Sequence, residues 1–217
     1  MSLADGKPPC PLCGEQKTGP YWRDQRRTYL LCNFCSLVFV PRQFHLSPEE
    51  ERAVYDLHEN DPLDAGYRQF LSRLSRPLLA KLASPCRGLD FGCGPGPALQ
   101  RLLIEAGHSV DLYDPFYYND RTIFEKRYDF ICATEVVEHL DAPGETFGSL
   151  FGLLRPGGWL AIMTKLVCDP ASFQRWHYIR DPTHICFYSR STFAFLAQWQ
   201  QADLEIIGND VILLQKR

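Results

Sequence analysis

A glycine-rich segment near the middle of the chain constrains the fold more than any other feature. Residues 87–104 read Arg-Gly-Leu-Asp-Phe-Gly-Cys-Gly-Pro-Gly-Pro-Ala-Leu-Gln-Arg-Leu-Leu-Ile. A short apolar strand ends at Asp90, the glycines follow, and apolar residues then recur at helical spacing as far as Ile104. The next strand is expected over 109–113 and ends in Asp114. This order predicts a β-α-β unit of a parallel sheet, which binds ligands at the carboxyl ends of its strands.

The spacing of the glycines distinguishes two kinds of ligand. A dinucleotide-binding loop requires G-x-G-x-x-G, but Pro97 stands where the third glycine is needed. The pattern present is D-x-G-x-G-x-G, formed by Asp90, Gly92, Gly94 and Gly96. Such glycines let the backbone approach a nucleoside that carries no phosphate. Asp114, 22 positions after Gly92, is placed to accept hydrogen bonds from both ribose hydroxyls. A purely structural glycine turn is the alternative.

The rest of this half of the chain continues the α/β pattern. A buried strand is expected over 128–133, a loop and short helix over 134–140, a helix over 147–154, and a sharp turn at 154–158 before a strand over 159–163. A capped helix over 191–199 precedes an antiparallel hairpin of 204–207 with 211–214. Only thirteen residues lie between Asp114 and Tyr128, which is short for this pattern. We predict a Rossmann-like, doubly wound α/β sheet with a C-terminal antiparallel hairpin.

Nine cysteines in 217 residues cannot form a fully paired disulfide framework. Four of them stand as two C-x-x-C pairs eighteen residues apart: Cys10, Cys13, Cys32 and Cys35. The first pair is followed by Gly14, a residue that takes positive φ without strain. Two such turns on neighbouring hairpins supply four soft ligands for a closed, structural Zn²⁺ site. An iron centre, or cysteines without a metal, are the alternatives.

The flanks of the second pair indicate a small zinc ribbon, with short strands over 28–31 and 37–40. Fewer than fifty residues build no stable core, so the metal would supply most of the folding energy, on the order of 10 kcal/mol. Residues 1–47 hold six basic and three acidic side chains, and the remainder 17 basic and 23 acidic ones. We interpret Arg23, Arg26 and Arg27 as a solvated hairpin edge; a nucleic-acid patch is the alternative.

Several protein classes are excluded by the composition. The formal net charge is -3, and no stretch approaches the 18 apolar residues of a membrane-spanning helix. Residues 1–7 lack the apolar core of a signal peptide. We therefore expect a cytoplasmic protein without a membrane partner. The division that follows is a ribbon module (1–47), linker helices (48–85), which a capping serine at Ser47 precedes, and the α/β domain with the glycine loop (86–217).

From residue 86 onward the sequence resembles the class I methyltransferases that use S-adenosylmethionine. The resemblance rests on the glycine loop, Asp114, the segment Glu135-Val-Val-Glu138-His139-Leu140 and the turn Leu154-Arg-Pro-Gly-Gly158 in the order typical of that family. It implies that the cofactor is bound by Asp90, Gly92, Cys93, Gly94, Gly96, Asp114, Thr134, Glu135 and Val136. The resemblance also implies a third strand, placed at 121–124, which the short connection before Tyr128 forces to be short, together with the helix before it. In many relatives an acid after that strand contacts the adenine, and Glu125 is the one candidate for it here.

The segment over 169–188 is long for a connection and dense in aromatic residues and histidine, as expected of a loop that closes over a substrate. His184 is the first candidate for a general base or acceptor-orienting group, because Asp-Pro-Thr-His resembles a segment of relatives with a similar ribbon. His177 and Tyr178 are of second rank, and His139 is a further candidate. His184 and His139 each have a structural alternative, in packing or in capping. We expect Glu138 to be solvated or structural, and Cys86, Cys132, Cys168 and Cys186 to be core residues.

Three functions fit these features. The first is a methyltransferase acting by in-line transfer on a small-molecule acceptor, such as a modified sugar or a natural-product or glycan precursor. The second is an RNA methyltransferase that grips nucleic acid with its ribbon, which the acidic charge of residues 48–217 disfavours. The third is a non-catalytic, zinc-dependent binding or sensor module.

Overall fold

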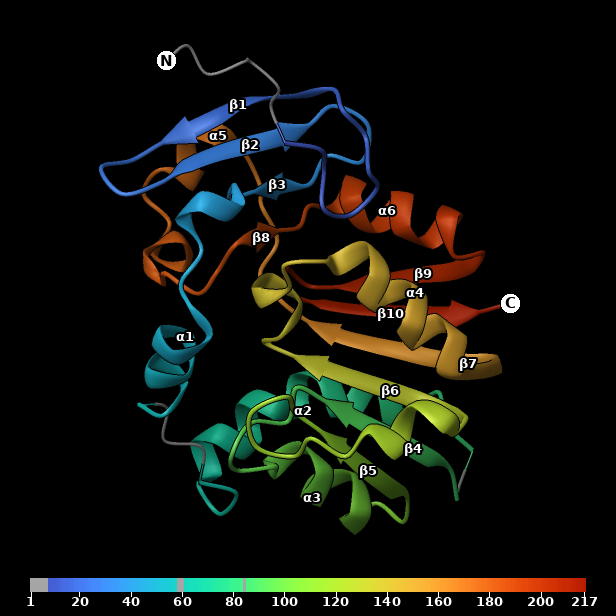
Figure 1. Cartoon of the computed structure of the whole chain (residues 1–217). Coiled ribbons are helices and arrows are strands. Elements are labelled where there is room, and N and C mark those ends of the chain that lie inside the picture. The colour runs from blue at the N-terminus through green and yellow to red at the C-terminus, as the bar shows by residue number, and fades with distance from the viewer. Residues whose placement is uncertain (1–7, 58–60, 84) are drawn as a thin grey trace.

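The computed structural model describes residues 8–57, 61–83 and 85–217, and shows two sheets with the helices packed around them (Figure 1). Residues 1–7, on which the expectation about a signal peptide rests, lie outside the described ranges. None of the helices in these ranges combines the length and the apolar character needed to cross a bilayer.

The larger sheet has six strands and carries the parallel core of the fold. Its order is β5 (Ser109–Tyr113), β4 (Arg87–Phe91), β6 (Tyr128–Thr134), β7 (Leu154–Met163), β10 (Val211–Lys216) and β9 (Ala202–Ile207). Strands β5, β4, β6 and β7 are parallel, whereas β10 is antiparallel to both β7 and β9. The predicted doubly wound α/β sheet with a C-terminal antiparallel hairpin is confirmed by this order.

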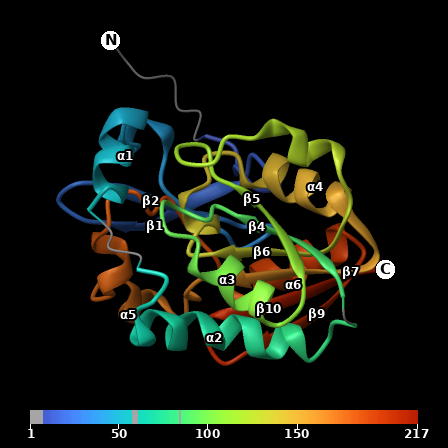
Figure 2. The same ribbon diagram turned by 90° about the horizontal axis from the view of Figure 1, so that it is seen from below.

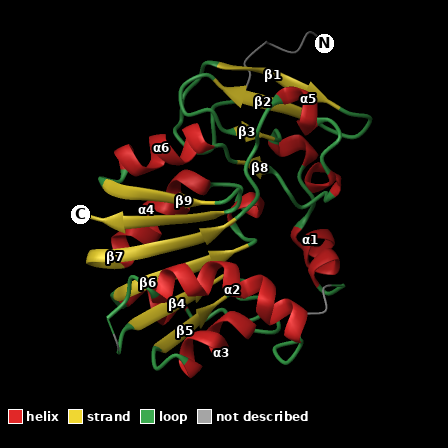
Figure 3. Cartoon of the chain, turned by 180° about the vertical axis from the view of Figure 1, so that it is seen from behind, coloured by secondary structure: helices red, strands yellow, loops and turns green. Residues whose placement is uncertain are grey.

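Helices cover both faces of the larger sheet, as Figures 2 and 3 show. On one face, α2 (Ala65–Leu79) and α3 (Ala98–Glu105) pack Leu71, Leu74 and Leu103 against one set of alternating strand residues. On the other, α4 (Pro143–Leu153) and α6 (Arg190–Trp199) join the opposite set of strand residues in a second apolar cluster. Alternation of side chains along each strand produces this division.

The smaller sheet combines the amino-terminal hairpins with a strand from the far end of the chain. Its order is β1 (Thr18–Arg23), β2 (Thr28–Cys32), β3 (Val38–Phe39) and β8 (Cys186–Phe187), all antiparallel. Tyr29 packs edge-on against Phe173 and Phe187, with ring centroids 5.2 and 5.8 Å apart. The hairpins therefore share a core with the segment over 169–188, which also carries α5 (Pro170–Phe173) and the 3-10 helix η4 (His177–Arg180).

Between the two sheets the chain runs through the short 3-10 helix η1 (Arg42–Phe44) and then α1 (Pro48–Tyr55). Ser47 caps α1 as expected: its side chain accepts a hydrogen bond from the amide of Glu50, whose carboxylate accepts one from the amide of Ser47. In Figure 1, β6 and β7 point toward α1. The helix therefore lies beside the carboxyl ends of the parallel strands.

Two expectations about the larger sheet are wrong. The segment expected as a third strand over 121–124 is the 3-10 helix η2 (Arg121–Glu125), because the residues between Asp114 and Tyr128 are too few for a helix and a strand. The sharp turn expected over 154–158 is an irregularity inside β7, which begins at Leu154. Gly157 adopts a φ of 77° there. The strand thus bulges instead of starting after the turn.

The first cysteine turn docks directly on α4. The amide of Gly144 donates a hydrogen bond to the carbonyl of Pro11, 3.2 Å away. A Cβ on Gly144 would lie 2.3 Å from the carbonyl oxygen of Leu12, so no larger residue fits without separating the two segments. This contact fixes the distance between the amino-terminal hairpins and the larger sheet.

We predict that Gly144→Ala destabilises the protein by about 1–3 kcal/mol, because its methyl group overlaps the backbone of Leu12. Gly148 lies on the same helix and is exposed, and a Cβ added to it would meet nothing within 4 Å, so Gly148→Ala is the matched control. That variant should be neutral or more stable by up to about 1 kcal/mol. Urea unfolding measures both free energies, and equal changes would contradict the docking contact.

Candidate active site

A cavity of about 720 Å³ opens at the carboxyl ends of the parallel strands. Its walls come from the loops after β4, β5 and β6, from α1 and α2, and from the segment over 181–184. The lining residues that the argument uses are Glu51, Tyr55, Tyr67, Asp90, Gly92, Cys93, Gly94, Asp114, Thr134, Glu135, Val136, His139, Asp141, Asp181 and His184. This is the edge at which open α/β sheets bind their ligands.

The glycine loop forms one wall and is held against the neighbouring strand. The amide of Gly92 donates a hydrogen bond to the carbonyl of Tyr113, 2.7 Å away. Gly92 and Gly94 adopt φ values of 73° and 62°, which favour glycine. A Cβ on Gly92 would lie 2.5 Å from a methyl group of Val136. The loop therefore reaches the segment after β6 only because position 92 has no side chain.

Asp114 is buried at the end of β5 and is oriented by three backbone amides. One carboxylate oxygen accepts a hydrogen bond from the amide of Gly94 at 3.0 Å. The other accepts from the amides of Phe116 and Tyr117 at 2.9 and 3.2 Å. A carboxylate offers about four acceptor positions, so these bonds fix its direction and leave capacity for a ligand hydroxyl.

The cavity is strongly acidic. Six carboxyl side chains line it, namely Glu51, Asp90, Asp114, Glu135, Asp141 and Asp181, and no lysine or arginine stands among its described lining residues. Burial raises the pKa of Asp90 to about 7 and that of Glu135 to about 7. Such a surface attracts a cationic ligand and repels phosphate groups.

A second group of polar side chains lies beside His139 and His184, which line the end of the cavity toward the smaller sheet. Glu138, on the 3-10 helix η3 (Val137–His139), is fully buried and accepts a hydrogen bond from the hydroxyl of Tyr178. The ring centroids of His139 and His184 lie 4.7 Å apart. Burial, together with the charge of Glu135, raises the pKa of Glu138 to about 8. The expectation that Glu138 is solvated is therefore wrong. Its complete burial fits the other expectation, a structural role.

The structure brings some of the predicted site residues together and leaves others apart. Two of the three candidate histidines, His139 and His184, line the cavity. His177 is exposed outside it, with its Nε2 atom 2.7 Å from the Nζ atom of Lys165. Among the predicted cofactor residues, Gly96 lies in the loop but is not a lining residue, and Glu125 is exposed at the end of η2.

Sequence reasoning missed the residues of α1 and α2 that close the cavity. We expected these helices only as a linker, yet Tyr55 and Tyr67 stand on the cavity wall. Burial raises the pKa of Tyr67 to about 12, so its hydroxyl stays protonated. The sequence did contain a signal for their role. Aromatic residues cluster on these two helices, although the fold of the glycine-loop domain does not require them.

Arg27 connects the smaller sheet to the cavity. Its guanidinium donates to four backbone carbonyls of one segment, those of Ile179, Asp181, Pro182 and His184, at 2.6 to 3.0 Å. The residue is 7% exposed, so its placement on a solvated hairpin edge was wrong. A planar fork of N–H donors suits a curved row of carbonyls, which an ammonium group cannot match. Arg27 thereby holds the turn that presents His184.

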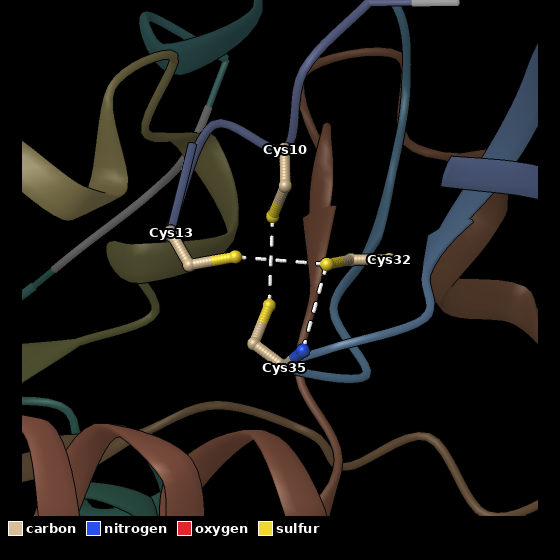
Figure 4. Close-up of side chains that lie close together, drawn as sticks. All are labelled: Cys10, Cys13, Cys32 and Cys35. Carbon is tan, nitrogen blue, oxygen red and sulfur yellow. Dashed lines mark hydrogen bonds between the residues drawn. The ribbon is translucent and has the colours of Figure 1, made fainter. Parts of the chain in front are cut away.

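The four cysteines of the two C-x-x-C pairs converge on one point, as Figure 4 shows. The sulfur atoms of Cys10 and Cys35 are 3.5 Å apart, and those of Cys13 and Cys32 are 3.6 Å apart. All four are free thiols whose sulfurs lie within 4.8 Å of one another. Gly14 adopts a φ of 75°, and Ser36 repeats that conformation after the second pair. The donor set and its spacing fit a tetrahedral thiolate site.

The remaining cysteines divide by burial. Cys132 and Cys186 are core residues, as expected, and Cys86 is half-buried. Cys168 is exposed, so its assignment to the core is wrong. Cys93 lines the cavity, where burial raises the pKa of its thiol. Cys93 is therefore present as the neutral thiol beside the glycine loop.

Comparison with protein families gives one match over most of the chain. The family described as "Methyltransferase domain" matches residues 63–208, which include the glycine loop, Asp114 and the histidines of the cavity. A search of curated proteins returned no significant match.

Solved structures share the fold at low sequence identity. A 1,6-didemethyltoxoflavin N1-methyltransferase of Burkholderia thailandensis superposes with a TM-score of 0.57 at 18% identity, covering 91% of this chain and 98% of that one. A magnesium protoporphyrin IX methyltransferase of Synechocystis gives 0.52 at 11% identity, covering 80% and 96%. A SAM-dependent methyltransferase of Archaeoglobus fulgidus gives 0.52 at 19% identity, covering 69% and 94%. These similarities show a common Rossmann-like fold.

We predict that Arg27→Lys loosens the segment over 179–184, because one ammonium group cannot replace four guanidinium hydrogen bonds. Amide hydrogen exchange at His184 and Ile185 should accelerate at least about tenfold, equal to about 1.4 kcal/mol. Arg26→Lys, at the exposed neighbouring position, is the control and should leave exchange unchanged. Unaltered protection in the Arg27 variant would show that other contacts hold the segment.

Proposed function

Because this chain belongs to the methyltransferase domain family, we propose that it transfers the methyl group of S-adenosylmethionine to a small-molecule acceptor. The observation that supports this most is the acidic cavity between the glycine loop and Asp114. S-Adenosylmethionine carries a sulfonium and an ammonium group but no phosphate, and carboxylates without a lysine or arginine suit that charge. The described lining residues include no lysine or arginine to pair with phosphate groups, which argues against RNA as the acceptor.

We assign the cofactor to the part of the cavity nearest β4 and β5. The backbone at Gly92, Cys93, Gly94 and Gly96 would follow the methionine part, with Asp90 behind it. Asp114, already oriented by backbone amides, would accept hydrogen bonds from the ribose hydroxyls. The segment of Thr134, Glu135 and Val136, which contacts the glycine loop, would lie along the nucleoside. Bound there, the cofactor supplies an electrophilic methyl group.

The acceptor would occupy the end of the cavity lined by His139 and His184. In-line transfer needs the nucleophile close to the methyl group and collinear with the bond that breaks, so residues that orient the acceptor contribute most. The structurally similar enzyme from Burkholderia was solved with 1,6-didemethyltoxoflavin and S-adenosylhomocysteine, a precedent for a small acceptor on this fold. His177, which lies outside the cavity, is the weakest of the three predicted catalytic histidines.

We further propose that Cys10, Cys13, Cys32 and Cys35 hold a structural Zn²⁺ ion. The ribbon module (1–47), the linker helices (48–85) and the methyltransferase domain (86–217) remain our proposed division. The ribbon would act on the domain through its shared sheet with β8 and through Arg27. Its role is then to hold the acceptor end of the cavity in place.

Asp114→Asn should weaken binding of S-adenosylhomocysteine at least tenfold, because an amide accepts fewer and weaker hydrogen bonds from the ribose than a carboxylate does. Isothermal titration calorimetry measures the dissociation constant. Asp120→Asn is the control, since Asp120 is exposed, accepts hydrogen bonds from Thr122 and is not among the described lining residues of the cavity. An unchanged constant in the Asp114 variant would remove the ribose assignment.

Metal analysis of protein purified without a chelator should find about one zinc per chain, bound by the four thiolates. Cys13→Ser should lose most of that zinc and lower the unfolding temperature, because metal binding contributes directly to folding of such a small module. Cys168→Ser, at an exposed cysteine away from the cluster, should retain the zinc. Equal zinc contents in both variants would place the metal elsewhere.

A further inference from the structure

We propose that Glu138, His139 and His184 form a second metal site, for a divalent first-row transition ion, at the acceptor end of the cavity. One ligand atom from each residue lies within 4.8 Å of the other two. Two imidazoles and one carboxylate are a donor set that binds such ions while leaving coordination positions open. The role of the ion rests on the methyltransferase function proposed above. The binding of the ion does not depend on that function.

The buried carboxylate is the first independent observation. Glu138 is 0% exposed, and its Oε2 atom has no hydrogen-bond partner among the described residues. Its other oxygen is occupied by the hydroxyl of Tyr178. No lysine or arginine in the described part of the chain forms an ion pair with it. A buried carboxylate oxygen is expensive to leave unpartnered, and a bound cation satisfies it.

The orientation of the two imidazoles is the second observation. Nδ1 of His184 lies 2.8 Å from the carbonyl of Tyr178, and Nδ1 of His139 lies 3.2 Å from the carbonyl of Thr183. A carbonyl only accepts, so Nδ1 donates the hydrogen bond in both rings, and in a neutral imidazole the lone pair then lies on Nε2. Metal-ligating histidines are oriented in the same way, by a backbone carbonyl on the nitrogen that does not bind the metal.

The surroundings add negative charge around this position. Asp181 places Oδ2 3.8 Å from Nε2 of His184, beyond hydrogen-bond distance, and its Oδ1 is held by the amide and hydroxyl of Thr183. Glu135 lies on the other side, with an oxygen 3.4 Å from the Tyr178 hydroxyl. A cation between these carboxylates is stabilised by all of them.

An ion here also indicates the chemical class of the acceptor. Because His139 and His184 line the cavity, an acceptor hydroxyl there could bind the ion through oxygen and become more acidic. The hydroxyl proton would pass to water, the oxygen lone pair would form the new bond to the methyl carbon, and the pair from the broken C–S bond would remain on sulfur. The acceptor is then a small molecule with a hydroxyl group able to bind a metal, and the product is its methyl ether.

The test is titration of the zinc-containing protein with Mn²⁺, followed by electron paramagnetic resonance, without any substrate. Manganese prefers oxygen and nitrogen ligands to thiolates, so the cysteine cluster does not compete. The expected result is one bound Mn²⁺ per chain. Glu138→Gln, which conserves shape, and His184→Asn should each weaken Mn²⁺ binding at least about tenfold. His177→Asn, on the same segment but outside the cluster, should retain it.

Circular dichroism and S-adenosylhomocysteine binding in the same preparations separate the possible failures. Wild-type protein that binds S-adenosylhomocysteine but not Mn²⁺ would overturn the metal site and leave the methyltransferase function standing. Protein that binds Mn²⁺ but not S-adenosylhomocysteine would overturn the proposed function and leave the metal site. Mn²⁺ bound equally well by the folded Glu138→Gln and His184→Asn variants would place the ion at other carboxylates and reject the assignment.

Discussion

The four hydrogen bonds from the Arg27 guanidinium are the contact on which the arrangement of the site depends. Four carbonyls of one short segment face the same point, and buried carbonyls require donors. A single planar group satisfies all of them from the amino-terminal hairpin. The hairpin is itself fixed by the close approach of Leu12 to Gly144. The position of His184 is therefore determined by residues more than 150 positions earlier in the chain.

The parts of this structure that could be predicted from the sequence are those set by local geometry. Glycines that require positive φ, the capping serine before α1 and the paired cysteine turns each depend on a few neighbouring residues. The burial of Arg27 could not be predicted in this way, because its partners lie on a distant segment. The same holds for Glu138, whose surroundings include Tyr178 of η4 and the amide of Ile185 before β8. The third strand was expected from the family resemblance, but the connection between Asp114 and Tyr128 is too short for it and forms the 3-10 helix η2 instead.

The concentration of carboxyl groups around the cavity costs the protein stability, and binding of a cationic ligand explains why they are there. Asp90 and Glu138 are buried, and the pKa of each rises because the charged form loses its solvation. A chain selected only for stability would replace such groups with apolar ones of similar volume. A cationic ligand changes this balance, because it stabilises the carboxylates that destabilise the empty fold. The acidic cavity is thus evidence for a ligand independent of any family resemblance.

The two proposed metal sites differ in their donor atoms and in their access to the cavity. The cysteine cluster is closed and built from four soft thiolates, a donor set that selects zinc and offers no position to a substrate. The Glu138 cluster has harder nitrogen and oxygen donors, and its two histidines line the cavity. Arg27 and β8 join the segments that carry them, so loss of zinc from the first site would also displace His184 in the second. Zinc at the cysteine cluster would then control binding of the second ion, although it contacts none of the residues of the Glu138 cluster.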